Sequence, residues 1–66
     1  MTKDQVATAG SFLVLVRNFP GTALLLGKEL FDLIAIAQKV YSGKAASNTD
    51  MIKVAKATTQ MCDMLG

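Results

Sequence analysis

The side chains that most often carry chemistry are scarce in this 66-residue sequence. Histidine is absent, and Cys62 is the single cysteine. Without histidine the chain lacks the commonest general base and cannot form a Ser-His or Cys-His nucleophile pair. One thiol and five scattered carboxylates cannot supply the three or four ligands of a zinc site. We therefore expect a protein that is not an enzyme, with no catalytic residues, no metal site and no cofactor site.

The segment closest to a phosphate-binding motif is Ser42-Gly43-Lys44. A Walker motif requires a glycine five residues before its Gly-Lys pair and a serine or threonine after the lysine. Those two positions hold Gln38 and Ala45. The segment is instead predicted to end a helix, with Gly43 in the left-handed position that follows many helices.

A cluster of lysines is the second chemical feature. Residues 39–56 contain one acidic residue, Asp50, and four lysines: Lys39, Lys44, Lys53 and Lys56. The favoured interpretation is a solvated helix end and loop. The next is contact with anionic lipid headgroups, worth about 1 kcal/mol per lysine near the surface. Nucleic-acid binding is not expected, because it calls for arginines and stacking aromatic residues, and only Tyr41 lies near.

Hydrophobic periodicity predicts a single all-α domain over residues 1–66, with two to three helices at about 4–19, 21–42 and 49–65. Thr2 and Gln5 have the spacing of a capping box at the first helix. The run from Phe12 to Val16 is apolar on every side, which predicts burial all round. The break at residues 17–21 contains Pro20, which suits the first position of a new helix. A helical hairpin and a kinked rod both fit this break.

The second predicted helix carries the strongest apolar pattern. Its stripe consists of Leu26, Leu30, Leu33, Ala37 and Val40, widened by Leu25, Phe31, Ile34 and Ile36. Lys28, Asp32, Ala35 and Lys39 line the opposite strip. Lys28 and Asp32 stand one turn apart and can pair, within or between subunits. A helix of about 22 residues is about 33 Å long, enough to cross a bilayer. The charges of Lys28, Glu29 and Asp32 near its middle argue against an isolated membrane span.

The third predicted helix is amphipathic. Ser47, Asn48 or Thr49 can cap it, with Asp50 in its first turn. One face consists of Met51, Val54, Ala55, Thr58, Met61, Cys62 and Leu65. On that face Cys62 is expected to be a small buried apolar residue.

The composition sets a burial problem. The chain is 52% hydrophobic and 18% charged, against about 25% charged for an ordinary soluble domain. Small domains are usually completed by disulfides, by a metal or by a partner. Because the first two are excluded here, we expect oligomerisation with copies of the chain or association with lipid. The residues predicted to pack between subunits are Phe12, Leu13, Leu26, Leu30, Leu33, Ile34 and Ala37.

A short apolar helical chain with a proline break and a lysine-bearing loop resembles the pilins of type IV secretion and conjugation systems. Locally, Leu24-Leu25-Leu26 through Lys39-Val40-Tyr41-Ser42-Gly43-Lys44 is similar to the membrane segment of small Dot/Icm-type secretion proteins. The resemblance covers about residues 11–48. It implies helical filaments whose apolar helices pack between subunits and hold phospholipid. It also implies that Lys39 and Lys44 face the lumen or a lipid headgroup.

The leading hypothesis is therefore a self-assembling subunit of a pilus-like filament or secretion channel, at the cell surface or in the inner membrane. The alternative is a soluble, cytoplasmic helical module that dimerises or docks on a partner. A membrane-active peptide is the second alternative. The start of the chain does not have the layout of a signal peptide. Either the chain is cytoplasmic or a leader has been removed.

Overall fold

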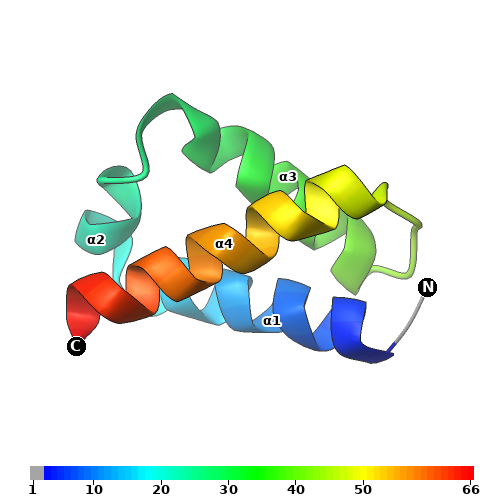
Figure 1. Ribbon diagram of the computed structural model, residues 1–66, viewed down its shortest axis with the longest axis horizontal. Helices are drawn as coiled ribbons and strands as arrows, with labels where there is room; N and C mark the ends of the chain where they lie inside the picture. Colours follow the sequence, from blue (N-terminus) through cyan, green and yellow to red (C-terminus); the bar gives the residue numbers. More distant parts are fainter. Residues whose placement is uncertain (1–2) are drawn as a thin grey trace.

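The computed structural model describes residues 3–66 and arranges them as a small helical bundle (Figure 1). In chain order its elements are α1 (Lys3–Asn18), α2 (Pro20–Leu24), the 3₁₀ turn η1 (Gly27–Glu29), α3 (Leu30–Tyr41) and α4 (Asn48–Leu65). The predicted all-α fold class is confirmed, since the described part of the chain contains helices and no strands. Thr2, half of the expected capping box, lies outside the described residues.

The three long helices pack side by side along the longest dimension of the molecule. α3 runs antiparallel to α1, whereas α4 runs parallel to α1 (Figure 1). Each of the three contacts the other two. The starts of α1 and α4 therefore share one end of the bundle, and α2 lies with the end of α4 at the opposite end.

The core lies where these three helices meet. Its buried residues are Ala9, Phe12, Ala23, Leu30, Leu33, Ala37, Val40, Met51, Val54, Ala57 and Met61. The stripe predicted for the second helix is buried from Leu30 to Val40, and Leu26 is half-buried against it. The spacing of three and four residues places one side chain per turn on the face that α1 and α4 cover.

The predicted continuous helix over residues 21–42 is wrong. The chain leaves the α-helix after Leu24 and re-enters it at Leu30. Gly27 lies between them with φ +77°, a left-handed conformation that costs other L-residues about 1–2 kcal/mol. Because the chain turns here, α3 folds back along α1, and the hairpin alternative describes the first half of the chain.

The chain also changes direction between α1 and α2, at Phe19 and Pro20 (Figure 1). Pro20 occupies the first turn of α2, as expected from its missing N–H group. Helical hydrogen bonds continue across the junction, from the Phe19 N–H to the Leu15 carbonyl at 2.8 Å and from the Ala23 N–H to the Phe19 carbonyl at 3.0 Å. This turn and the one at Gly27 together fold α3 back along α1.

The signals predicted around the α3–α4 loop are confirmed. The Ser47 hydroxyl accepts a hydrogen bond from the Asp50 N–H at 3.1 Å and caps α4. Gly43 adopts φ +99° after α3. The Lys44 N–H donates to the Lys39 carbonyl at 3.0 Å, which completes a Schellman motif.

Two burial predictions are wrong. Val14 is 56% exposed although it lies inside the run expected to be buried on every side. Cys62 is exposed rather than buried. Leu25 and Phe31, which widen the predicted apolar stripe, are exposed as well. The reason is common to Val14, Phe31 and Cys62: in a three-helix bundle each helix has two neighbours, so one strip of every helix faces solvent whatever its residue type.

Candidate association surface

More than half of the large apolar residues that are exposed in the described part of the chain lie at one end of the bundle. Within residues 3–66 the exposed large hydrophobic residues are Val14, Phe19, Leu24, Leu25, Phe31, Tyr41, Ile52, Met64 and Leu65. Five of these nine belong to α2 with its flanks or to the last turn of α4. We define Phe19, Leu24, Leu25, Met64 and Leu65 as the end patch. Contiguous exposed apolar surface marks association sites on small proteins.

The two leucines of the end patch are exposed because α2 is short and uses one residue for the core. Ala23 is buried against the rest of the bundle. Successive residues of a helix point about 100° apart, so Leu24 and Leu25 turn away from the core. They are 66% and 70% exposed. α2 ends at Leu24, so no further helical turn follows that could cover them.

The last turn of α4 completes the end patch. Met61 is buried, whereas Met64 and Leu65 lie beyond the core and are partly exposed. α2 contacts α4, and Figure 1 shows α2 and the C-terminus at the same end of the molecule. Exposed charges at this end include Lys28 and Glu29, which follow the two leucines in η1, and Asp63 in the last turn of α4. The end patch is thus an apolar surface with charges of both signs beside it.

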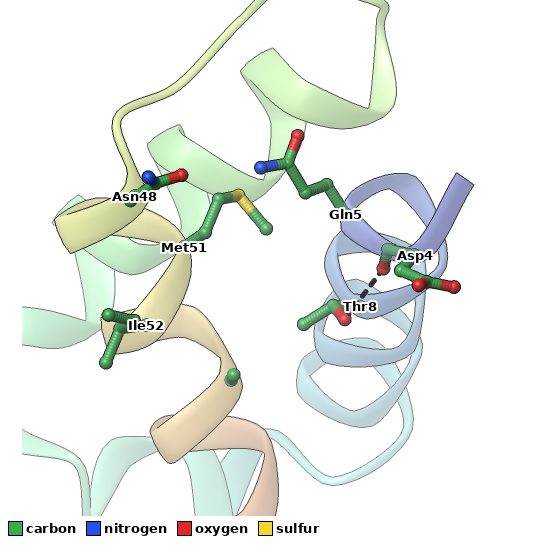
Figure 2. A pocket seen from close by; sticks show the side chains of 7 residues that line it. Asp4, Gln5, Thr8, Asn48, Met51 and Ile52 are labelled. Atoms are coloured by element: carbon green, nitrogen blue, oxygen red, sulfur yellow. Dashed lines mark hydrogen bonds between the residues drawn. The ribbon is translucent and has the colours of Figure 1, made fainter. Parts of the chain in front are cut away.

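A groove lies at the opposite end, between the first turns of α1 and α4. We call it the α1–α4 groove; its volume is about 410 Å³, and its lining residues are Asp4, Gln5, Thr8, Asn48, Met51, Ile52 and Ala55. Figure 2 shows Met51 reaching from α4 towards Gln5 of α1, with Ile52 on the outer side of α4. The Thr8 hydroxyl donates to the Asp4 carbonyl at 2.8 Å and so is turned back onto its own helix.

A second hollow, of about 630 Å³, lies along the middle of α1 and α4. Ala7, Gly10, Val14, Tyr41 and Cys62 are among its lining residues. The Tyr41 ring packs so closely over α1 that a Cβ atom on residue 10 would lie 3.1 Å from it. Gly10 therefore permits the close approach of α3 to α1 at this point.

The residues predicted to pack between subunits serve the core of a single chain. Phe12, Leu30, Leu33 and Ala37 are buried, and the half-buried residues Leu13, Leu26 and Ile34 pack against them. The sequence pattern does not reveal the end patch, because Leu24, Leu25 and Leu26 continue the apolar spacing of one predicted helix over residues 21–42. Gly27 is the one local sign that a helix can be interrupted in this segment.

The predicted polar residues lie on the surface. Lys28 is exposed in η1 and Asp32 is exposed in α3, and pairing between them stays a prediction. Lys39 and Lys44 are exposed at the end of α3 and in the loop that follows, away from the end patch (Figure 1). The structure therefore separates the predicted headgroup lysines from the most exposed leucines.

Comparison of the chain with family models, with curated proteins and with solved structures gave no match. In the described residues, no helix combines the length and the apolar character that crossing a membrane requires. In the same residues no three His, Cys, Asp or Glu side chains are grouped as metal ligands.

Proposed function

We propose that this protein is a non-enzymatic structural subunit that associates with further copies of itself through the end patch. In its most concrete form the assembly is a pilus-like helical filament or a secretion channel, as the resemblance to pilins implies. One observation carries the proposal: the bundle covers its long apolar stripe within one chain, yet five of the nine exposed large apolar residues among residues 3–66 belong to α2 with its flanks and the last turn of α4, at one end of the bundle.

The size of this surface supports a specific contact. Fully burying a leucine stabilises by about 1.5–3 kcal/mol, so covering Leu24 and Leu25, each about two-thirds exposed, contributes about 1–2 kcal/mol apiece. Together that is about 2–4 kcal/mol, or roughly 30- to 700-fold in a dissociation constant. This gain is set against the free-energy cost of association, so the two leucines favour a contact without fixing its affinity.

The distribution of charge favours protein over lipid as the partner. A helix that lies on a membrane combines its apolar residues and its lysines on one surface. Here Lys39 and Lys44 lie towards one end of the bundle and the end patch lies at the other. The two lysines and the end patch therefore do not form one continuous amphipathic surface, which favours a protein partner.

Sedimentation velocity across a wide concentration range tests the proposal. The wild-type chain is expected to form species larger than a monomer as concentration rises, and Leu25→Ser is expected to shift that transition to higher concentration. Val14→Ser is the matched control, because Val14 is also an exposed aliphatic residue but lies outside the end patch. A wild-type chain that stays monomeric to millimolar concentration would refute self-association.

Negative-stain electron microscopy of the associated material distinguishes the forms of assembly. Filaments or rings support the structural subunit. A discrete dimer with no larger species removes the filament and leaves the dimerisation module.

A further inference from the structure

We propose that Gly27 is a hinge through which two copies of the chain exchange their α3–α4 hairpins. In the exchanged dimer α2 and α3 join into one helix, and α3 and α4 of each copy pack on α1 of the other copy. The inference goes beyond the proposed function, because it uses the core contacts of the bundle and not the end patch.

A single residue separates α2 from α3 in backbone conformation. Leu25, Leu26 and Glu29 have φ values of −68°, −70° and −73° and lie in the right-handed helical region. Between the start of α2 and the end of α3, the one residue with positive φ is Gly27, at +77°. A rotation of Gly27 into the right-handed region would therefore fuse the two helices.

The apolar pattern is already that of the fused helix. Leu26, Leu30 and Leu33 follow one another at spacings of four and three residues, which place them on one helix face across the hinge. A glycine inside a helix is only about 4- to 5-fold less favourable than an alanine. The hinge sequence therefore permits both the turn of the closed bundle and a continuous helix.

Fusion of the helices separates α3 from α1 of its own chain, because the turn at Gly27 helps to fold α3 back along α1 (Figure 1). The α3–α4 hairpin can leave as a unit, since α3 and α4 contact each other as well as α1. Its apolar face then lacks the core residues that α1 supplies, Ala9 and Phe12.

A second copy of the chain is the partner that fits this face. Its α1 presents the same two core residues, Ala9 and Phe12, in the same helix. Reciprocal exchange therefore remakes the contacts of α1 with α3 and α4 between chains and keeps the contact of α3 with α4 within each chain. Because the same side chains meet in both forms, the hinge and the protein concentration decide between them.

Gly27→Ala should shift this equilibrium to the exchanged dimer. Alanine is about 5- to 30-fold less favourable in the left-handed region, and it is about 4- to 5-fold more favourable than glycine in a helix. The two effects multiply to about 20- to 150-fold per hinge. Because the dimer contains two hinges, its dissociation constant should fall by at least about 400-fold relative to the wild type.

Gly21→Ala is the matched control. It makes the same replacement at a residue of α2 that is already helical, where a Cβ atom meets nothing within 4 Å. It should leave the dissociation constant of the exchanged dimer as it is in the wild type. D-alanine at position 27, introduced by chemical synthesis, is the reciprocal variant. A D-residue favours positive φ, so this variant should stay monomeric where Gly27→Ala is dimeric.

Tyr41 provides a direct test of exchange, because it is the single tyrosine and its ring packs over α1 at Gly10. In the closed bundle, and in any assembly through the end patch, this contact lies within one chain. In the exchanged dimer it joins two chains. Isotope-labelled and unlabelled Gly27→Ala chains are refolded together, and cross-relaxation is measured between Gly10 of the labelled chain and the Tyr41 ring of the unlabelled chain.

An interchain signal from Gly27→Ala is expected, with none from Gly21→Ala at a concentration where the wild type is monomeric. The inference is overturned if Gly27→Ala is monomeric, if circular dichroism shows it to be unfolded, or if its Tyr41 contact stays within one chain. Dimerisation of the D-alanine variant to the same extent as Gly27→Ala would overturn it as well.

These outcomes are independent of the proposed function. Loss of association in Leu25→Ser, with no interchain signal in Gly27→Ala, supports the end patch and removes the hinge. A wild-type chain that stays monomeric to millimolar concentration, with an interchain signal in Gly27→Ala, removes association through the end patch and supports the hinge.

Discussion

Replacing Phe12 by alanine should remove much of the stability of the bundle. Phe12 has no exposed surface and lies in the core that α1, α3 and α4 share. Truncating a buried phenylalanine costs about 3–5 kcal/mol. A chain of 66 residues has a total unfolding free energy of about 3–10 kcal/mol at the usual 0.05–0.15 kcal/mol per residue. Phe12→Ala should therefore lower the melting temperature by about 12–40 °C, at 4–8 °C per kcal/mol.

Phe31→Ala is the matched control, since the same truncation at a 75% exposed position should change the stability by no more than about 0.5 kcal/mol. Both variants are measured by urea unfolding followed by circular dichroism, at a concentration where the wild type is monomeric. Equal losses from the two variants, or a loss below about 1 kcal/mol from Phe12→Ala, would refute the claim that one chain closes its own core.

Two further substitutions, each with a control, test the local devices of the fold. Gly27→Ala should destabilise the bundle by about 1–2 kcal/mol, because alanine is strained at φ +77°. Gly21→Ala should stabilise it by about 0.5–1 kcal/mol, since residue 21 is helical and a Cβ atom there meets nothing within 4 Å. Equal effects at the two glycines in thermal unfolding would contradict the reversal at Gly27. Ser47→Ala should lower the free energy of unfolding by about 1 kcal/mol, because the α4 cap is lost. The control Ser11→Ala, at an exposed position, should change it by no more than about 0.5 kcal/mol. A Ser47→Ala variant as stable as Ser11→Ala in urea unfolding would show that the cap contributes nothing.

Local signals made the α3–α4 region predictable from sequence. A serine cap and a left-handed glycine are short-range features, since each is satisfied by atoms within a few residues. Ser47 and Gly43 therefore adopt the predicted roles. The stripe from Leu30 to Val40 was predictable for a related reason, because periodicity alone identifies which face of a helix is apolar.

The break at Gly27 was not predictable from periodicity. Leu26 and Leu30 continue the same apolar spacing on both sides of the glycine, so the pattern shows no interruption. A glycine in a helix costs only about 1 kcal/mol, and tertiary contacts decide whether the helix ends there. In this fold the packing of α3 against α1 requires the reversal, which frees Leu24 and Leu25 from the core. The end patch thus depends on how the helices are arranged in space, and a short sequence pattern does not specify that arrangement.

The exposure of Cys62 and Val14 has the same origin. Both residue types are commonly buried, and each lies on a helix with many apolar residues. Whether a given residue faces a neighbouring helix depends on how many neighbours that helix has. The composition predicts more apolar surface than one chain of this size can bury. The bundle nevertheless buries eleven apolar residues in a single core.

Self-association through the end patch is tested by a dilution series of amide nitrogen–proton correlation spectra of the wild-type protein. As concentration rises, we expect chemical-shift changes at residue 19, at residues 21–25 and at residues 64–65. The exposed face of α3 around Phe31, Asp32 and Ala35 should remain unchanged. Shifts centred on that α3 face, or spectra that do not change with concentration, would show that the end patch is not an association surface.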